Sequence, residues 1–280
     1  MPSSLYIVAT PVGNLEDITF RAVRVLKEAK AVACEDTRVT AKLFARYRIG
    51  SRLISCREHN EARQAENIIR ILKEEGDVAL VTDAGTPMLS DPGMRVVRRA
   101  AAEGFAVVPV PGASALLCAL CAGAVPFEDF TFLGFLPRRK GKAEKVLSEF
   151  ISSPRVVVIY ESPKRTVATL ALILEILGDR EAAVCREMTK MHEETLRGKV
   201  SFLSQNFAER ETVKGEVVIV VSGAEQTGPD EKETEKLLRK LKKDGVSFKD
   251  AVKTAMDETD AAKNPVYSSA LRVWGKNGSR

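Results

Sequence analysis

The sequence has few of the residues that bind metals or form disulfides. Its 280 residues include only two histidines and five cysteines, and the cysteines are scattered along the chain. An odd, scattered set of cysteines does not form a disulfide framework and fits a reducing compartment. Cys118 and Cys121 lie inside an apolar run, where free cysteine packs as a small hydrophobic residue. With no further ligands nearby, we predict no metal site.

Long apolar runs are also absent. No stretch of about eighteen uncharged apolar residues occurs, and residues 1–8 lack a basic segment followed by an apolar run and a cleavage site. These absences predict a cytoplasmic protein that does not bind membranes.

The apolar and charged fractions are 45% and 29%, which is typical of globular proteins and excludes disorder of the whole chain. The net charge is +5, and residues 231–280 alone carry 12 Lys and Arg against 8 Asp and Glu. A second basic cluster, Arg138, Arg139, Lys140 and Lys142, lies in an expected loop. Basic patches attract phosphate backbones, although a merely solvated surface has the same composition.

The first half of the chain alternates strand and helix patterns. Nearly continuous apolar strands separated by helices predict a mainly parallel sheet covered on both faces. The expected strands are residues 5–9, 31–34, 52–55, 78–82 and 106–110, and the expected helices are residues 18–29, 39–47, 61–75 and 94–103.

The second half of the chain has a different order of expected strands and helices. Its expected strands are residues 130–135, 156–160, 182–186, 193–198 and 215–221, with three helices between them. Two consecutive strands without a helix indicate a mixed or antiparallel sheet. Turn residues 226–229 then precede a Lys- and Glu-rich helix at 232–243, which predicts an appendage of two or three helices. We therefore predict domains at residues 1–117, 118–225 and 226–280.

Open α/β sheets bind ligands where parallel strands end, and three such junctions are unusual. The segment ATPVGNLED (residues 9–17) lacks the G-x-G-x-x-G spacing of a dinucleotide site. DAGTPMLSDPG (83–93) and VPGASA (110–115) are rich in residues that let a ligand approach the backbone. The alternatives are a structural turn in which Ser90 or Asp91 caps the next helix, and close packing of that helix on the sheet.

Taken together, several motifs resemble the ribosomal RNA small-subunit methyltransferase I family. They are ATPVGNLEDIT, DAGTPMLSDPG and VPGASA, together with CEDTR (34–38), EHNE (58–61) and YESPKR (160–165). The resemblance extends from Leu5 to about Gly223, and the tail is similar to the family's C-terminal appendage. It implies a two-lobed, tetrapyrrole-methylase-like α/β fold, S-adenosylmethionine as cofactor, and 2'-O-methylation of a cytidine in the decoding region of 16S rRNA. It also implies a homodimer acting on 16S rRNA or the 30S subunit.

The resemblance further implies which residues hold the cofactor. They are Pro11, Gly13, Asp83, Ala84, Gly85, Thr86, Pro87, Gly112, Ala113, Ser114, Ala115, Tyr160 and Glu161.

Methyl transfer to a ribose hydroxyl needs an aligned nucleophile and benefits from a base that accepts its proton. The candidate bases are Glu35, Asp36, Glu187 and Lys190, and the sequence does not choose among them. Asp36 or Thr37 is equally an ordinary helix cap. The candidate RNA contacts are Arg38, His59, Arg138, Arg139, Lys140 and Arg186. Asn60, next to His59, is also a good cap for the following helix.

Three other functions remain for comparison. A methyltransferase of the same fold acting on a tetrapyrrole or a protein would share the cofactor loop and differ only on the substrate side. A non-catalytic ribosome-assembly protein would have a degraded cofactor loop, whereas residues 83–93 are intact. A dehydrogenase is disfavoured because the dinucleotide fingerprint is missing.

Overall fold

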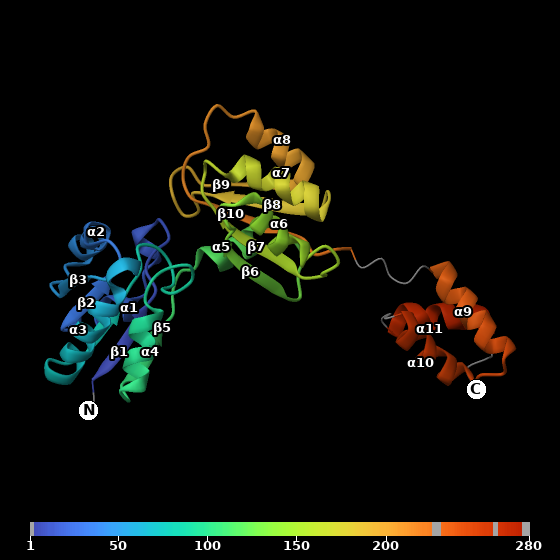
Figure 1. The fold of residues 1–280 in the computed structure, drawn as a ribbon, viewed down its shortest axis with the longest axis horizontal. Helices are drawn as coiled ribbons and strands as arrows, with labels where there is room; N and C mark the ends of the chain where they lie inside the picture. Colours follow the sequence, from blue (N-terminus) through green and yellow to red (C-terminus); the bar gives the residue numbers. More distant parts are fainter. Residues whose placement is uncertain (1–2, 226–230, 260–262, 276–280) are drawn as a thin grey trace. The chain divides into compact units, whose positions relative to one another are not determined.

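The computed structural model describes residues 3–225, 231–259 and 263–275, and the predicted turn at 226–229 lies outside them. The chain divides into two compact units, Met1–Ala224 and Glu225–Arg280, shown in Figure 1. Among the described residues, no helix is long and apolar enough to cross a membrane.

The first sheet of the larger unit is entirely parallel, with strand order β3-β2-β4-β1-β5. Its strands are β1 (Ser4–Val8), β2 (Ala31–Cys34), β3 (Arg52–Ser55), β4 (Val78–Leu80) and β5 (Ala106–Val110). Its helices are α1 (Phe20–Glu28), α2 (Thr37–Tyr47), α3 (Glu61–Glu74) and α4 (Met94–Ala102), with 3-10 turns η1 (Leu15–Asp17) and η2 (Glu58–Asn60). The predicted parallel lobe is confirmed.

Alternation along the strands explains why helices cover both faces of this sheet. Leu5 and Ile7 of β1 belong to a core with α3 and α4, whereas Val8 belongs to a core with α1 and α2. Successive side chains of a strand point to opposite faces, so each face needs its own helical layer. Figure 1 shows these elements from blue to green.

Side-chain caps shift two helix starts from their predicted positions. Thr19 accepts a hydrogen bond from the Ala22 amide, so α1 begins at Phe20 and not at Ile18. Asp36 accepts one from the Arg38 amide, so α2 begins at Thr37 and not at Val39. Capping satisfies amides that have no partner within the helix.

The second sheet is mixed, with order β6-β7-β10-β8-β9. Only β6 and β7 pair in parallel; β10 and β9 join by antiparallel pairing. The strands are β6 (Phe130–Phe135), β7 (Val156–Glu161), β8 (Glu181–Arg186), β9 (Glu194–Lys199) and β10 (Val217–Val221). The helices are α5 (Ala115–Gly123), α6 (Lys140–Ser148), α7 (Thr166–Leu177) and α8 (Val200–Ala208). The predicted mixed-sheet lobe is confirmed.

Helix α5 packs on the second sheet. Leu116 and Leu120 lie in one core with β7, β8 and β10, while α6, α7 and α8 cover the other face. The predicted boundary at residue 117 therefore falls inside a helix that packs with the second lobe. The division into three domains stays a prediction.

The smaller unit is a three-helix bundle. It contains α9 (Glu231–Lys243), α10 (Phe248–Thr259) and α11 (Lys263–Trp274), packed around Leu238, Ala251 and Ala270. The Trp274 ring lies edge-on to Phe248, with centroids 5.8 Å apart. Trp274 is the only tryptophan of the chain and lies in this unit.

Candidate functional site

The three unusual junctions meet at the carboxyl ends of the first sheet. Thr10 and Gly85 form an isolated antiparallel bridge, with amide-to-carbonyl distances of 2.8 and 3.0 Å. The Thr10 hydroxyl also donates to the Thr82 carbonyl at 3.0 Å. The Thr86 hydroxyl donates to the Ala113 carbonyl at 3.2 Å, which joins the second junction to the third. The loops are therefore fixed to one another through their backbones.

The loop from Thr82 to Gly93 has an unusual backbone. Gly85, Met88, Ser90 and Gly93 all have positive φ, at 80°, 71°, 72° and 131°. For Met88 and Ser90 this is a strained conformation that the surroundings must hold in place, as at ligand-binding sites. At Gly93 even a Cβ atom would lie 2.7 Å from Leu80 Cδ2, so only glycine fits.

A cavity of about 340 Å³, which we call the Tyr160 pocket, opens beside this loop. Its volume is within the range of small-molecule sites. Six of the predicted cofactor residues line it: Ala84, Gly85, Thr86, Ala115, Tyr160 and Glu161. The remaining lining residues include Phe135, Asp91 and Glu216.

A second cavity of about 450 Å³, which we call the Lys42 pocket, adjoins the first. Pro11, Gly13, Asp83 and Ala84 of the predicted cofactor set line it, as does the predicted base Lys190. Val12, Ala84 and Glu216 line both cavities. The predicted cofactor residues are thus divided between two neighbouring pockets.

Four predicted cofactor residues, Pro87, Gly112, Ala113 and Ser114, line neither pocket. A Cβ atom on Gly112 would lie 3.0 Å from Ala9 Cβ, so this glycine lets the first and third junctions approach each other. Ser114 is the residue before α5, although its side chain does not cap the helix. These residues shape the loops that border the pockets.

Tyr160 and Glu161 have structural contacts besides their place in the pocket wall. The Tyr160 hydroxyl accepts a hydrogen bond from the Leu116 amide at 3.1 Å, at the start of α5. Its ring lies edge-on to Phe135, with centroids 5.9 Å apart. The Glu161 carboxylate is 2% exposed and accepts from the Thr169 hydroxyl and the Ser162 amide, each at 2.7 Å.

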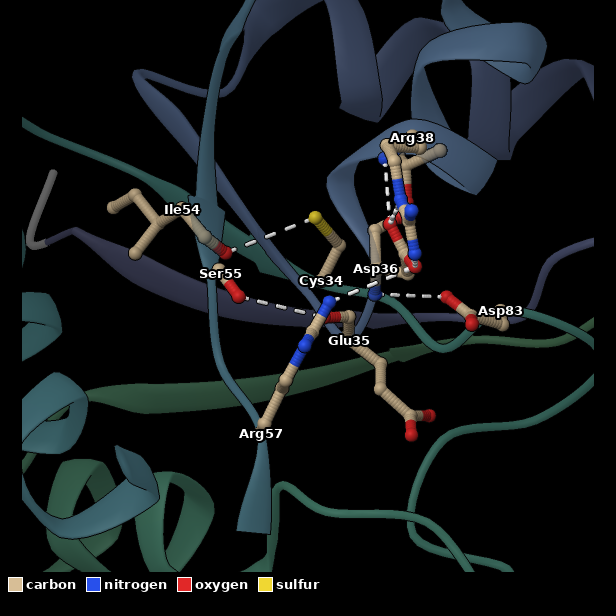
Figure 2. Close-up of polar contacts among 9 residues, drawn as sticks. Cys34, Glu35, Asp36, Arg38, Ile54, Ser55, Arg57 and Asp83 are labelled. Atoms are coloured by element: carbon tan, nitrogen blue, oxygen red, sulfur yellow. Dashed lines mark hydrogen bonds and ion pairs between the residues drawn. The ribbon is translucent and has the colours of Figure 1, made fainter. Parts of the chain in front are cut away.

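Charged residues at the ends of β2 and β3 form a second polar group, shown in Figure 2. The Arg38 guanidinium holds the Asp36 carboxylate, with Nε 3.0 and 3.2 Å from its two oxygens. These hydrogen bonds hold the pKa of Asp36 well below its usual range. Arg57 Nε donates to the Glu35 carbonyl at 3.0 Å, while the Glu35 carboxylate points away from Asp36.

Glu35 and Asp91 are the carboxylates whose pKa shifts toward neutral pH. Burial raises the pKa of Glu35, and the charges of Asp83 and Asp91 raise it further. Burial also raises the pKa of Asp91, although the Thr82 hydroxyl opposes this shift. A carboxylate with a raised pKa is a better proton acceptor than an ordinary one.

The predicted bases Glu187 and Lys190 bind each other. Lys190 Nζ lies 2.8 Å from Glu187 Oε1 and 3.2 Å from Glu216 Oε2. The hydrogen bond from Lys190 lowers the pKa of Glu187. Burial lowers the pKa of Lys190, but its two carboxylate partners outweigh this and leave the pKa raised. Both groups are therefore held in their charged forms, which suits binding better than proton transfer.

The turn that contains Glu187, Thr189 and Lys190 packs closely against Gly13. A Cβ atom there would lie 2.4 Å from Lys190 Cγ and 2.8 Å from Thr189 Oγ1. The Asn14 amide donates to Thr189 Oγ1 at 3.0 Å. Glu187 and Thr189 have positive φ, at 51° and 66°, which is rare for a β-branched residue such as threonine. The absence of a Cβ atom at Gly13 thus lets this turn of the second lobe approach the first junction, where the Asn14 amide binds it.

The predicted RNA contacts are scattered over the larger unit. Arg138, Arg139 and Lys140 are exposed, and His59 is exposed in η2. The expected loop for the basic cluster is wrong in part, because Lys140 and Lys142 lie in the first turn of α6. Lys140 pairs with Glu175 at 3.1 Å. Arg186 is engaged internally, with Glu194 at 2.9 Å and the Lys214 carbonyl at 3.2 Å.

The side-chain caps considered for α3 and α4 are not formed. Asn60 does not cap α3; its side chain accepts from the Arg57 amide at 2.8 Å. Neither Ser90 nor Asp91 caps α4. Glu61, 7% exposed, accepts from the amides of Gly93 and Arg95 at 3.0 and 2.7 Å. This cap comes from another helix, so local sequence patterns did not indicate it.

Sequence reasoning also missed Asp91 and Glu216 as pocket residues.

All five cysteines are free, with Cys34, Cys56 and Cys185 buried. Burial raises the pKa of the Cys56 thiol to about 11. Within the described residues, no group of three His, Cys, Asp or Glu side chains could hold a metal ion.

Comparison with solved structures finds proteins of the same fold. Cobalt precorrin-4 methyltransferase aligns with a TM-score of 0.61 at 18% identity, covering 78% of this chain and 94% of that one. Uroporphyrin-III C-methyl transferase from Thermus thermophilus, solved with S-adenyl homocysteine, aligns with a TM-score of 0.56 at 21% identity, covering 78% and 96%. At these identities, the likeness shows a shared fold.

Sequence comparison identifies the family of the chain. The family described as Tetrapyrrole (Corrin/Porphyrin) Methylases matches residues 4–203. Ribosomal RNA small subunit methyltransferase I of Halalkalibacterium halodurans is 42% identical, over 95% of this chain and 93% of that protein. The protein of the same name from Thermotoga maritima is shorter: it is 46% identical, over 79% of this chain and 99% of its own length. The chain therefore belongs to the tetrapyrrole methylase family and, by its relatives, to the ribosomal RNA small subunit methyltransferase I family.

Proposed function

We propose that this protein transfers the methyl group of S-adenosylmethionine to the 2'-hydroxyl of a cytidine in the decoding region of 16S rRNA. The names of its relatives support a ribosomal RNA substrate. The observation that carries the proposal is the pair of adjoining pockets beside the strained loop at residues 82–93. A transferase needs room for a donor and an acceptor side by side.

The Tyr160 pocket suits the cofactor. The rings of Phe135 and Tyr160 offer apolar surface for an adenine, while the loop at Gly85 lets a ligand approach the backbone. S-adenosylmethionine supplies a methyl group activated by a positively charged sulfur. The acidic residues Asp91 and Glu216 line the same pocket, and a carboxylate there complements a positive charge; that of Glu216 is shared with Lys190 at 3.2 Å.

Among the four predicted bases, Glu35 is the one that we propose to accept the hydroxyl proton, on the direction of its pKa, since it lines neither pocket and only Lys190 of the four lines one. Asp36 is held by Arg38, and Glu187 and Lys190 neutralise each other. The pKa of Glu35 is raised by burial and by its acidic neighbours, which favours proton uptake. Asp91, whose pKa is also raised, is the second candidate.

The basic residues Arg138, Arg139 and Lys140 lie between the end of β6, where Phe135 lines the Tyr160 pocket, and the first residue of α6. This position supports a role in holding RNA phosphates near the site of transfer. We also propose a cytoplasmic location, because the proposed ribosomal RNA substrate lies there, and a homodimer, as the family resemblance implies. Sedimentation equilibrium of the purified protein tests the dimer.

The proposal is tested by transfer of labelled methyl from S-adenosylmethionine to 30S subunits and to free 16S rRNA that lack the modification. Nuclease mapping and mass spectrometry then locate the label. We expect it on one ribose 2'-oxygen of a cytidine in the decoding region. Cofactor binding without RNA labelling would instead favour a tetrapyrrole or protein substrate. Absence of cofactor binding would favour a non-catalytic RNA-binding protein.

A further inference from the structure

We propose that the Lys42 pocket binds the target nucleotide after it has been extruded from the RNA stack. The ribose would then lie at the wall that this pocket shares with the Tyr160 pocket. This inference rests on the proposed function and identifies the acceptor side of the same site.

The first argument is the position of the pocket. Methyl transfer needs the acceptor oxygen about 3 Å from the methyl carbon, so the acceptor must occupy space that adjoins the donor. Val12, Ala84 and Glu216 line both cavities. Two other described cavities, at Phe20 and at Arg138, share no lining residue with the Tyr160 pocket.

The second argument is the size of the pocket. At about 450 Å³ it is in the range of small-molecule sites, so it has room for one nucleotide and none for a helix of paired bases. Enzymes that act on a buried nucleotide commonly extrude it into a pocket, at a cost of a few kcal/mol for unstacking. The geometry therefore favours a single extruded nucleotide over a docked duplex.

The third argument is the chemistry of the walls. Leu15, Val39 and Leu43 offer an apolar surface, while Thr82 and Asp83 offer polar groups. A nucleoside has both kinds of surface, since its base is flat and largely apolar on its faces and its ribose carries hydroxyls.

The fourth argument is the charge at the edge of the pocket. The two lysines that line it differ in their surroundings: Lys190 is paired with Glu187 and Glu216. Lys42 is exposed on α2, and no ion pair of its side chain occurs within the described parts of the chain. An exposed lysine at a pocket edge can bind the phosphate next to the extruded nucleotide.

The first test fills the pocket from its exposed side. Val39 lies on α2, is 38% exposed and lines the Lys42 pocket, but does not line the Tyr160 pocket. Val39→Trp should lower kcat/KM for methylation of 30S subunits by about 20-fold or more, with cofactor affinity in calorimetry unchanged. The matched control is Ala41→Trp, because Ala41 is exposed on the same helix and lines neither pocket.

The second test removes the charge and cannot disturb the core. Lys42→Ala should raise KM for 30S subunits and reduce the salt dependence of RNA binding by about one ion, and Lys42→Arg should restore both. Lys27→Ala, an exposed lysine of α1, is the control and should leave both unchanged.

The outcomes separate this inference from the proposed function. If wild-type protein labels 30S subunits and Val39→Trp matches Ala41→Trp, the inference is wrong and the proposed function stands. If Val39→Trp abolishes cofactor binding while Ala41→Trp does not, the Lys42 pocket belongs to the cofactor and the inference is again wrong. If wild-type protein binds the cofactor but labels no RNA, the proposed function fails, and the inference fails with it.

Discussion

Replacing Glu61 should destabilise the larger unit and loosen the loop at residues 82–93. Its carboxylate is the cap of α4 and accepts from the amides of Gly93 and Arg95 at 3.0 and 2.7 Å. A helix cap contributes about 0.5–2 kcal/mol and a hydrogen bond to a charged group about 1.5–3 kcal/mol. These contributions overlap, so we expect Glu61→Ala to lower the free energy of unfolding by about 3 kcal/mol.

The assay is urea denaturation followed by two probes. Far-UV circular dichroism reports on both units, whereas fluorescence of Trp274, the only tryptophan, reports on residues 225–280. A loss of about 3 kcal/mol should lower the midpoint of the larger unit by about 1 M urea. The Trp274 transition should not move, because Glu61 belongs to the other unit.

Two control variants separate the cap from its alternatives. Glu61→Gln keeps an oxygen acceptor without the charge and should cost about 1 kcal/mol. Glu66→Ala, on the same helix and 66% exposed in its ion pair with Arg99, should cost about 0.5 kcal/mol or less. Equal midpoints for Glu61→Ala and Glu66→Ala would refute the reasoning. Because Gly93 ends the strained loop, Glu61→Ala should also weaken binding of S-adenosylmethionine about tenfold, while Glu66→Ala should not.

Three further predictions follow from the site. Glu35→Gln should lower kcat by about 100-fold with unchanged cofactor affinity. Because burial raises the pKa of Glu35, the stability of the wild type should decline relative to that of the variant as pH rises through that pKa. A difference in urea midpoint that is the same at all pH values would contradict this. Replacing Arg138, Arg139 and Lys140 together by Ala should weaken binding to 16S rRNA and reduce the log–log salt slope by about two, and filter binding at several salt concentrations would expose an unchanged slope. Deleting residues 225–280 should spare cofactor binding, since the Thermotoga maritima relative matches over 79% of this chain and 99% of its own length. It should impair methylation of 30S subunits, because the excess of Lys and Arg in residues 231–280 favours contact with RNA phosphates; full activity of the shortened protein would exclude that contact.

The sequence was sufficient to predict both sheets and the segments that meet at the site. The apolar run at residues 31–34 became strand β2 with those bounds, because buried parallel strands need continuous apolar side chains. Residues 52–55 (RLIS) also became a strand with the predicted bounds, the edge strand β3, although only two of their side chains are apolar. Glycine and proline at residues 83–93 indicated a loop of special geometry, and Gly85 and Gly93 do adopt positive φ. These are local signals, which a single sequence contains.

Contacts between distant segments could not be predicted in this way. A helix cap at Ser90 or Asp91 was one of the alternatives, yet Asp91 lines the Tyr160 pocket, and Glu61, 32 residues from Gly93, provides the cap instead. Likewise, the sequence alone does not distinguish the four candidate bases. The structure distinguishes them, because Arg38 binds the Asp36 carboxylate and Lys190 binds the Glu187 carboxylate. A pKa depends on burial and on neighbours, and neither is present in a local pattern.

Both lobes contain residues with a strained backbone close to the pockets. Met88 and Ser90 in the first lobe and Glu187 and Thr189 in the second all have positive φ. Such conformations cost about 1–3 kcal/mol each and persist only where the surroundings hold them. Here those surroundings include the contacts that border both pockets: Glu61 on Gly93, and Gly13 against Thr189 and Lys190. Because the same contacts hold the strain and shape the walls, variants that relieve the strain should gain stability and lose activity together. Thr189→Gly is such a variant: it removes the penalty of positive φ, about 1–3 kcal/mol, and loses the exposed hydrogen bond from the Asn14 amide, which contributes only about 0.5–1.5 kcal/mol.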